Sequence, residues 1–217
     1  MEKRMLKTVS TVDAICSQLE NDIFFNLSPG EKITESSLNL RYGVSRNTLR
    51  EAIAYLISNG ILVKIANRGV FVREITREDV REIFSLRALL EAEAIRMIIE
   101  KNVSTSALSE KAELLTNTNP HDDWNEHVRA DMDFHSTLVA SAKSPRLSRL
   151  YDAIASEVML CICQSKQHIP LTTVNDISHR AILNALSEKK QALACQLLKK
   201  HIESAISNYE KGFDAQI

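Results

Sequence analysis

The sequence predicts a mainly α-helical chain in which three helices and a small β-hairpin come first and helices alone follow. Only 5 Gly and 4 Pro occur among 217 residues, so few positions favour a break in a helix. Apolar residues recur at every third or fourth position through most of the chain, as on the buried face of a helix. Up to residue 73 the chain also has two β-branched and aromatic runs, whereas every later segment has helical spacing. We therefore expect one domain over residues 1–74 and a second, all-helical domain over 75–217.

The elements of the first domain are separated by residues that end helices. Ser28-Pro29-Gly30 stops the first helix, Gly43 stops the second, and Ser45 has the hydroxyl favoured at the N-cap of the third. Two β-branched runs then flank a turn that contains Gly69, which predicts a hairpin. The expected elements are helices over 8–26, 35–42 and 45–59 and strands over 61–65 and 70–73. Three helices followed by a hairpin form a winged helix-turn-helix, in which the third helix enters the major groove of DNA.

The second domain is predicted to hold six helices. Thr76 and Asp79 have the spacing of a capping box, in which a hydroxyl and a carboxylate cap the same helix start. Later breaks are expected near Asn102, Asn117 to Pro120, Pro145, Pro170 and Ser187 to Lys189. The six helices are expected over 76–100, 104–116, 122–142, 145–167, 174–187 and 190–209.

Charge and hydropathy narrow the class of protein. The net charge of -1 excludes a histone-like basic protein, so any nucleic-acid surface must come from local clustering. Residues 1–75 hold ten Lys and Arg against eight Asp and Glu, so this part carries +2 and the remainder -3. No apolar run predicts a membrane span, and residues 1–10 lack the apolar core of an export signal. We therefore expect a cytoplasmic protein without a membrane partner, whose four cysteines are reduced thiols.

The start of the third helix has residue types that read DNA. Arg46 and Arg50 lie four positions apart and share a helix face, and Asn47 lies beside them. In the major groove arginine pairs with guanine and asparagine with adenine, while Ser45 and Thr48 can reach phosphates. By spacing alone, an ordinary surface helix with two arginines fits equally well.

Motifs in this domain resemble the signature of the GntR family of bacterial transcription regulators, approximately PG…LGVSRxx[VL]REAL…G[LI][VL]…xRGxFV. The matching segments are LSPGEKI at 27–33, YGVSRNTLREAI at 42–53, NGIL at 59–62 and NRGVFV at 67–72. The resemblance implies that the DNA-contacting positions of the family fall on Ser45, Arg46, Asn47, Thr48, Arg50 and Gly69. Arg68, at the tip of the hairpin, adds a cation where a neighbouring groove or backbone would lie. Ser36 and Thr48 stand where relatives have arginine and proline, which bears on the operator sequence.

In the second domain one carboxylate and three imidazoles have a spacing that suits a metal site. Asp131 and His135 lie four positions apart on one predicted helix and share a face. His179 and His201 each lie eleven positions from Lys190, so a helical hairpin that turns there brings both imidazoles to the same height. Such a set inside a helical bundle suits a divalent metal. The alternative, from spacing alone, is that these are ordinary surface or core residues.

The remaining histidines and two aromatic residues fit structural roles. His127 shares a row with Asp131 and His135 but lies about 12 Å from His135 along the helix, too far to share one ion. We therefore expect His127 to face solvent. His121 and His168 are also expected at the surface, and Trp124 and Phe134 in the core.

Several segments of this domain resemble the FCD sensor domain of the FadR-like branch of the GntR family. ADMDFHSTL at 130–138, followed by Pro145-Arg146-Leu147, resembles its D-x-x-F-H-x-x-L segment, and 178–186 and 201–202 resemble its later histidine segments. Six predicted helices, rather than seven, resemble the VanR-type subgroup. The resemblance implies a divalent metal, with Zn favoured over Ni or Mn, and a small organic or sugar acid as effector beside it. The implied metal ligands are Asp131, His135, His179 and His201.

Arg87 opens the segment RALLE at 87–91, which resembles the R-x-x-L-E segment of the same domain. Its guanidinium could bind the carboxylate of an effector through two hydrogen bonds. The alternatives are an ion pair with Glu91 at helical spacing and a structural contact between helices.

These observations predict a metabolite-responsive transcription regulator, not an enzyme. A homodimer would bind a pseudo-palindromic DNA operator, and the effector would change the spacing or mobility of the two winged helices. One alternative is a purely structural metal that stiffens the bundle. A metal-dependent hydrolase is another, although no general base stands at a diagnostic spacing and the winged helix would have no role.

Overall fold

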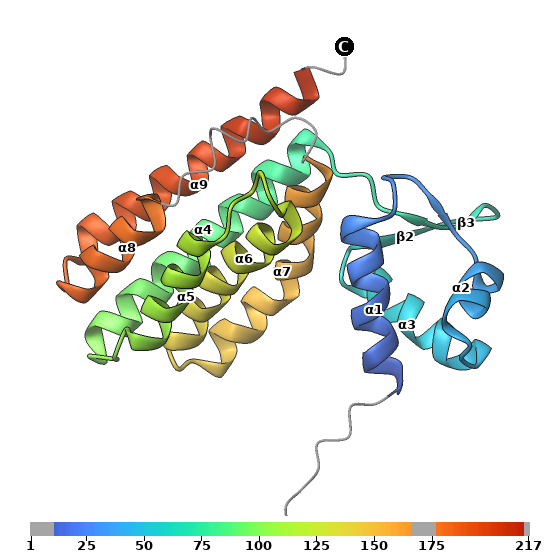
Figure 1. The fold of residues 1–217 in the computed structure, drawn as a ribbon, viewed down its shortest axis with the longest axis horizontal. Coiled ribbons are helices and arrows are strands. Elements are labelled where there is room, and N and C mark those ends of the chain that lie inside the picture. The colour runs from blue at the N-terminus through green and yellow to red at the C-terminus, as the bar shows by residue number, and fades with distance from the viewer. Residues whose placement is uncertain (1–10, 166–176, 215–217) are drawn as a thin grey trace, which may run out of the picture. The chain divides into compact units, whose positions relative to one another are not determined.

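The computed structural model describes residues 11–165 and 177–214, and this part of the chain contains nine helices and three short strands (Figure 1). The chain divides between Glu74 and Ile75 into two compact units. Within the described ranges, the first unit holds three helices and three strands, and the second holds helices alone. The predicted fold class is thus confirmed. Predicted features that fall between 166 and 176, including His168, lie outside the described residues.

The first unit contains a three-stranded antiparallel sheet in the order β1-β3-β2. The hairpin of β2 and β3 was predicted, but β1 was not, because a two-residue strand has no measurable periodicity. The bounds are α1 Thr11–Phe25, β1 Lys32–Ile33, α2 Glu35–Tyr42, α3 Arg46–Ser58, β2 Leu62–Ile65 and β3 Gly69–Val72. In the core, α1 and α3 pack through Leu19, Leu49 and Leu56, each fully excluded from solvent.

Local sequence signals place α3, the predicted recognition helix. Gly43 ends α2 with a φ of 63°, a left-handed conformation that glycine adopts without the penalty of a Cβ atom. The side chain of Ser45 then caps α3 by accepting a hydrogen bond from the backbone N–H of Thr48 at 3.2 Å. Asp22 of α1 is buried and accepts hydrogen bonds from Arg41 and Tyr42, so it ties the end of α2 to α1.

In its described residues, the second unit is a bundle of six helices, as predicted. The bounds are α4 Arg77–Glu100, α5 Ser106–Asn117, α6 Trp124–Ser141, α7 Pro145–Gln164, α8 Ile177–Ser187 and α9 Gln191–Asp214. The predicted capping box of Thr76 and Asp79 opens α4 with both of its hydrogen bonds. The long helix α4 contacts α6, α7 and α9, and α5 pairs with α6.

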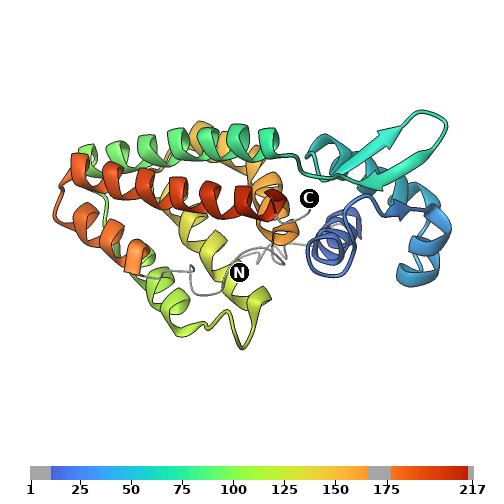
Figure 2. The same cartoon turned by 90° about the horizontal axis from the view of Figure 1, so that it is seen from above.

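The last two described helices form the hairpin that the histidine spacing required. α8 and α9 lie side by side in Figures 1 and 2 and are joined by a short turn in which Lys189 has a φ of 56°. This turn returns the chain so that α9 packs along α4. Among the described residues, no helix is both long and apolar enough to cross a membrane.

Candidate metal centre, effector cavity and DNA-binding surface

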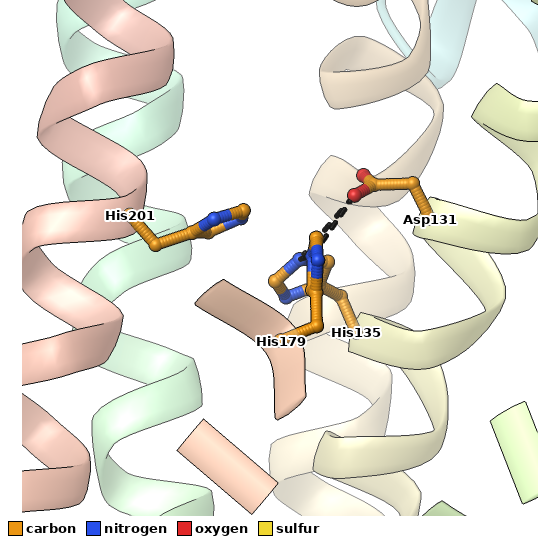
Figure 3. Close-up of side chains that lie close together, drawn as sticks. All are labelled: Asp131, His135, His179 and His201. Carbon is orange, nitrogen blue, oxygen red and sulfur yellow. Dashed lines mark hydrogen bonds and ion pairs between the residues drawn. The ribbon is translucent and has the colours of Figure 1, made fainter. Parts of the chain in front are cut away.

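Three helices of the bundle direct one carboxylate and three imidazoles toward a common point (Figure 3). Asp131 and His135 come from α6, His179 from the first turn of α8, and His201 from the middle of α9. One potential ligand atom from each residue lies within 4.8 Å of the others. The structure therefore brings together all four residues that the sequence proposed as metal ligands.

The distances within this cluster suit a metal site. His179 Nε2 lies 3.0 Å from Asp131 Oδ1 and 3.1 Å from His135 Nε2. Two nitrogen or oxygen ligands of one ion, each at about 2.1 Å, lie about 3.0–3.4 Å apart at octahedral or tetrahedral angles. Two ligand atoms on opposite sides of one ion lie about 4.2 Å apart at most. Ligand atoms in this cluster that are separated by up to 4.8 Å must therefore move slightly closer together to share an ion.

Hydrogen bonds behind the cluster orient two of the imidazoles. The Nδ1–H of His135 donates to Glu91 Oε2 at 2.7 Å, because a carboxylate only accepts, and this leaves Nε2 to face the cluster. His201 Nδ1 lies 2.8 Å from the hydroxyl of Ser178, so its Nε2 is likewise available. Metal-binding histidines usually have such a partner on the second ring nitrogen, since it fixes the ring and its tautomer.

The electrostatics of the cluster favour the protonation states that bind metals. Burial lowers the pKa of His135, with a further contribution from Arg87, and burial also lowers the pKa of His201 well below its usual range. Although burial opposes it, the hydrogen bond with His179 and the nearby His135 hold the pKa of Asp131 well below its usual range. Neutral imidazoles and an ionised carboxylate are the ligand forms of these groups.

Glu91 is fully buried and joins the cluster to Arg87. Besides His135, it accepts hydrogen bonds from Arg87 Nε at 2.8 Å and from the Tyr151 hydroxyl at 3.1 Å. Burial raises the pKa of this carboxyl, but His135 and Arg87 outweigh burial and lower it to about 2. The ion pair between Arg87 and Glu91, one of the alternatives to an effector role for Arg87, is therefore present.

Arg87 also has a polar atom without a partner beside the cluster. Its side chain is only 2% exposed, and among the described residues its Nη2 has no hydrogen-bond partner. A buried N–H group without a partner is destabilising by about 1–3 kcal/mol, and more when it is charged. Arg87 borders a cavity of about 350 Å³ that Asp131, His179 and His201 also line. An anion in this cavity could accept the free hydrogen bond.

The remaining wall of this cavity is mainly apolar, with polar side chains from α9. The apolar contributors include Trp124, Val128, Ile162, Leu197 and Ala205. The polar contributors on α9 are Lys200, Ser204 and Asn208. The cavity therefore combines a few polar groups, including Arg87 and the histidines, with a largely apolar lining, which is the usual character of a small-molecule site.

The prediction that His127 faces solvent is wrong. His127 is 3% exposed, lines the cavity, and has its Nδ1 2.8 Å from the hydroxyl of Thr118. Its helix position did not reveal this contact, because Thr118 lies in the α5–α6 connection, which packs against the ring only in the folded chain. The predictions for three neighbouring residues hold: His121 is exposed, and Trp124 and Phe134 are buried, although Trp124 also lines the cavity.

In the first unit, the residues predicted to contact DNA lie at the exposed start of α3 and at the tip of the hairpin. Ser45, Arg46, Asn47 and Arg50 are exposed, and Thr48 is half-buried. Arg50 donates from Nε to Glu35 Oε1 at 2.8 Å. This contact between α2 and α3 could not be read from the sequence, because the two residues lie fifteen positions apart on different helices.

Lys32 is a second cation near the tip of the hairpin, and the sequence alone did not identify it. Arg68 and Lys32 both lie over the ring of Phe71, at 5.7 and 5.8 Å from its centroid. Lys32 reaches this position because β1 pairs with β3, opposite Phe71. Gly69 has a φ of 115°, and a Cβ atom there would lie 3.1 Å from Lys32 Cε, so both conformation and space favour glycine.

Comparison with known proteins agrees with both units. Residues 11–72 match the bacterial regulatory proteins of the gntR family, and residues 82–204, more than half of the chain, match the FCD domain. The chain therefore belongs to the GntR family of transcription regulators and carries an FCD domain. Both matched domains are those of transcription regulators, not of enzymes.

Individual relatives extend the similarity over nearly the whole chain. The HTH-type transcriptional regulator BphR of Paraburkholderia xenovorans is 27% identical over 91% of this chain and 84% of its own length. A transcriptional repressor of a D-xylose utilization operon, from Paenarthrobacter nicotinovorans, is 26% identical over 99% of this chain and 96% of its own length. A GntR regulator of known structure from Rhodococcus sp. RHA1 has a TM-score of 0.81 and 27% identity, covering 93% of this chain and 98% of that chain.

Proposed function

We propose that this chain is a repressor whose operator binding is controlled by a small carboxylate metabolite, bound beside a divalent metal in the FCD domain. One observation carries the proposal: three of the four proposed metal ligands, Asp131, His179 and His201, line the same cavity as the buried Arg87, whose Nη2 has no hydrogen-bond partner among the described residues. A carboxylate metabolite in this cavity would lie beside three of the residues that would hold the metal and could accept a hydrogen bond from Arg87. The relative from Paenarthrobacter nicotinovorans, named as a repressor, supports the direction of control.

The metal in this proposal is held by Asp131, His135, His179 and His201. Mixed imidazole and carboxylate ligands favour Zn, while Ni and Mn accept the same set. When bound, the ion supplies a Lewis-acidic positive charge that attracts an oxygen of the effector. The chain itself orients His135 through Glu91 and His201 through Ser178.

A purely structural metal is the second candidate function of this site. It would need no cavity beside the ion and no buried hydrogen-bond donor left without a partner there. The cavity of about 350 Å³, lined by three of the four ligands and by Arg87, supports the sensor instead.

We further propose that the protein acts as a homodimer in the cytoplasm and binds a pseudo-palindromic operator. Two-fold symmetry of the protein would match two-fold symmetry of the DNA. Three leucines support an interface on two adjoining helices: Leu86 and Leu89 of α4 are 49% and 66% exposed, and Leu150 of α7 is 59% exposed. Large apolar side chains exposed on two packed helices suit a protein–protein contact.

The first experiment is a thermal-shift screen of small organic and sugar acids against the full chain, both metal-loaded and chelated. We expect at least one acid to raise the Tm of the metal-loaded protein alone, because its carboxylate needs both the ion and Arg87. The same acid should release the protein from its operator. Stabilisation by metal without any response to acids, together with unchanged operator binding, would favour the structural metal.

For DNA binding, we expect Arg50→Ala to abolish the preference for operator over random DNA while the Tm stays unchanged, since Arg50 is exposed. The operator probe is the duplex that the wild-type protein enriches from a random-sequence library. Wild-type discrimination by the variant would reject Arg50 as a reading residue.

A further inference from the structure

Arg50 is held by a carboxylate from the neighbouring helix. Its Nε donates to Glu35 Oε1 at 2.8 Å, and among the described residues its two Nη atoms make no hydrogen bond. Both side chains are solvent-accessible, with 62% of Arg50 and 39% of Glu35 exposed. In water such an ion pair adds little to stability, so stability alone gives no strong reason for a carboxylate beside a DNA-reading arginine.

The position of Glu35 is itself fixed by the start of α2. Thr34 caps this helix by accepting a hydrogen bond from the Ser37 backbone N–H, and Glu35 is the first helical residue. A carboxylate in the first turn of a helix is favoured by the helix dipole. The hydrogen bond from Arg50 lowers the pKa of Glu35, with smaller contributions from the charges of Arg50 and Arg46, so Glu35 is ionised at neutral pH.

We infer that Glu35 is a positioning residue for DNA recognition: it holds the Nε side of Arg50 so that Nη1 and Nη2 face a guanine. The inference rests on the proposed role of Arg50. A guanidinium is planar, so an acceptor at Nε fixes the plane and leaves the outer edge with two parallel donors. That edge matches the O6 and N7 acceptors of guanine in the major groove. A free arginine side chain must instead lose its rotamer freedom when it binds the base.

The opposite expectation follows if Glu35 is only a surface charge near the DNA. Its carboxylate would repel phosphates, and its removal would strengthen binding to every sequence alike. The two ideas therefore predict different changes in the ratio of operator affinity to non-specific affinity.

The test compares Glu35→Gln with Glu51→Gln in the full chain. Glu51 is exposed on α3, so its substitution makes the same charge change next to Arg50 in sequence. Affinities are measured for the library-selected duplex and for a scrambled duplex of equal length at fixed salt. We expect Glu35→Gln to lower the ratio of the two affinities about fivefold or more, with non-specific affinity equal or higher, whereas Glu51→Gln leaves the ratio unchanged.

Two further measurements separate positioning from other roles. In an Arg50→Ala background, Glu35→Gln should not lower the ratio of operator affinity to non-specific affinity any further, because a positioning residue acts only through the residue that it positions. The melting temperatures of all variants should agree, which excludes a loss of α2. The inference is overturned if Glu35→Gln keeps the wild-type ratio of operator affinity to non-specific affinity. It is also overturned if Glu35→Gln lowers that ratio by the same factor in the Arg50→Ala background as in the wild type. In both cases Arg50 remains a reading residue. If the Arg50→Ala variant alone discriminates operator from scrambled DNA as well as the wild type does, both the reading role of Arg50 and the positioning role of Glu35 are overturned.

Discussion

Replacing Glu91 by glutamine tests the polar network behind the metal cluster. Glu91 is fully buried and accepts hydrogen bonds from Arg87, His135 and Tyr151. Glutamine has nearly the same shape but no charge, and its NH₂ group would face a donor where the carboxylate had an acceptor. Because Arg87 is also buried, the variant leaves a buried cation without its counter-ion.

We expect this change to lower the free energy of unfolding of the helical unit by about 3–5 kcal/mol, the usual effect of removing one partner from a buried ion pair. For a unit of this size that corresponds to a fall in Tm of about 6–20 °C. The assay is thermal unfolding in the presence of a chelator, followed by tryptophan fluorescence. Trp124 is the single tryptophan of the chain and is buried in this unit, so the signal reports on the bundle and not on the winged helix.

Glu93→Gln is the matched control for this prediction. Glu93 lies two positions further along α4 and pairs with Arg96 at the surface, with 42% of its side chain exposed. Its substitution should leave the Tm nearly unchanged, since exposed ion pairs contribute little. If Glu91→Gln also melted at the wild-type temperature, the network would not stabilise the bundle and the argument that it preorganises His135 would fail.

Three other substitutions test the site and the assembly. His179→Ala should lower metal affinity about 100-fold or more, seen as lost stoichiometry after chelation and reloading, whereas the exposed His121→Ala should bind metal normally. Arg87→Lys should remove the thermal shift caused by an acid but keep the shift caused by metal, since lysine retains a charge for Glu91 but lacks the planar fork; an undiminished response to acid would exclude Arg87 from effector binding. Leu89→Glu should halve the mass found by analytical ultracentrifugation, while Leu114→Glu on α5, 55% exposed in the wild type, should not. A Leu89→Glu dimer would place the interface elsewhere.

Much of the fold follows from local signals in the sequence. Helical periodicity and caps at Ser45 and Thr76 predict the helices to within a few residues, because these signals act between neighbours in the chain. Strand β1 escaped prediction, since its two residues form a strand only by pairing with β3. The burial of His127 escaped for the same reason, because its partner Thr118 comes from outside its own helix.

The sequence by itself determined the family motifs, the six helices described in the second unit and the four residues proposed as metal ligands. Equal spacing of His179 and His201 about the α8–α9 turn made their approach predictable, because helix geometry converts sequence distance into height. Only the tertiary structure decided that Glu91 links Arg87 to His135, that Arg87 lines a cavity with no partner for its Nη2 among the described residues, and that Glu35 accepts a hydrogen bond from Arg50. The hydrogen bonds of Glu91 with His135 and of Glu35 with Arg50 join side chains from different helices. Whether Arg87 Nη2 has a partner depends on the helices packed around it. No local sequence pattern encodes this packing.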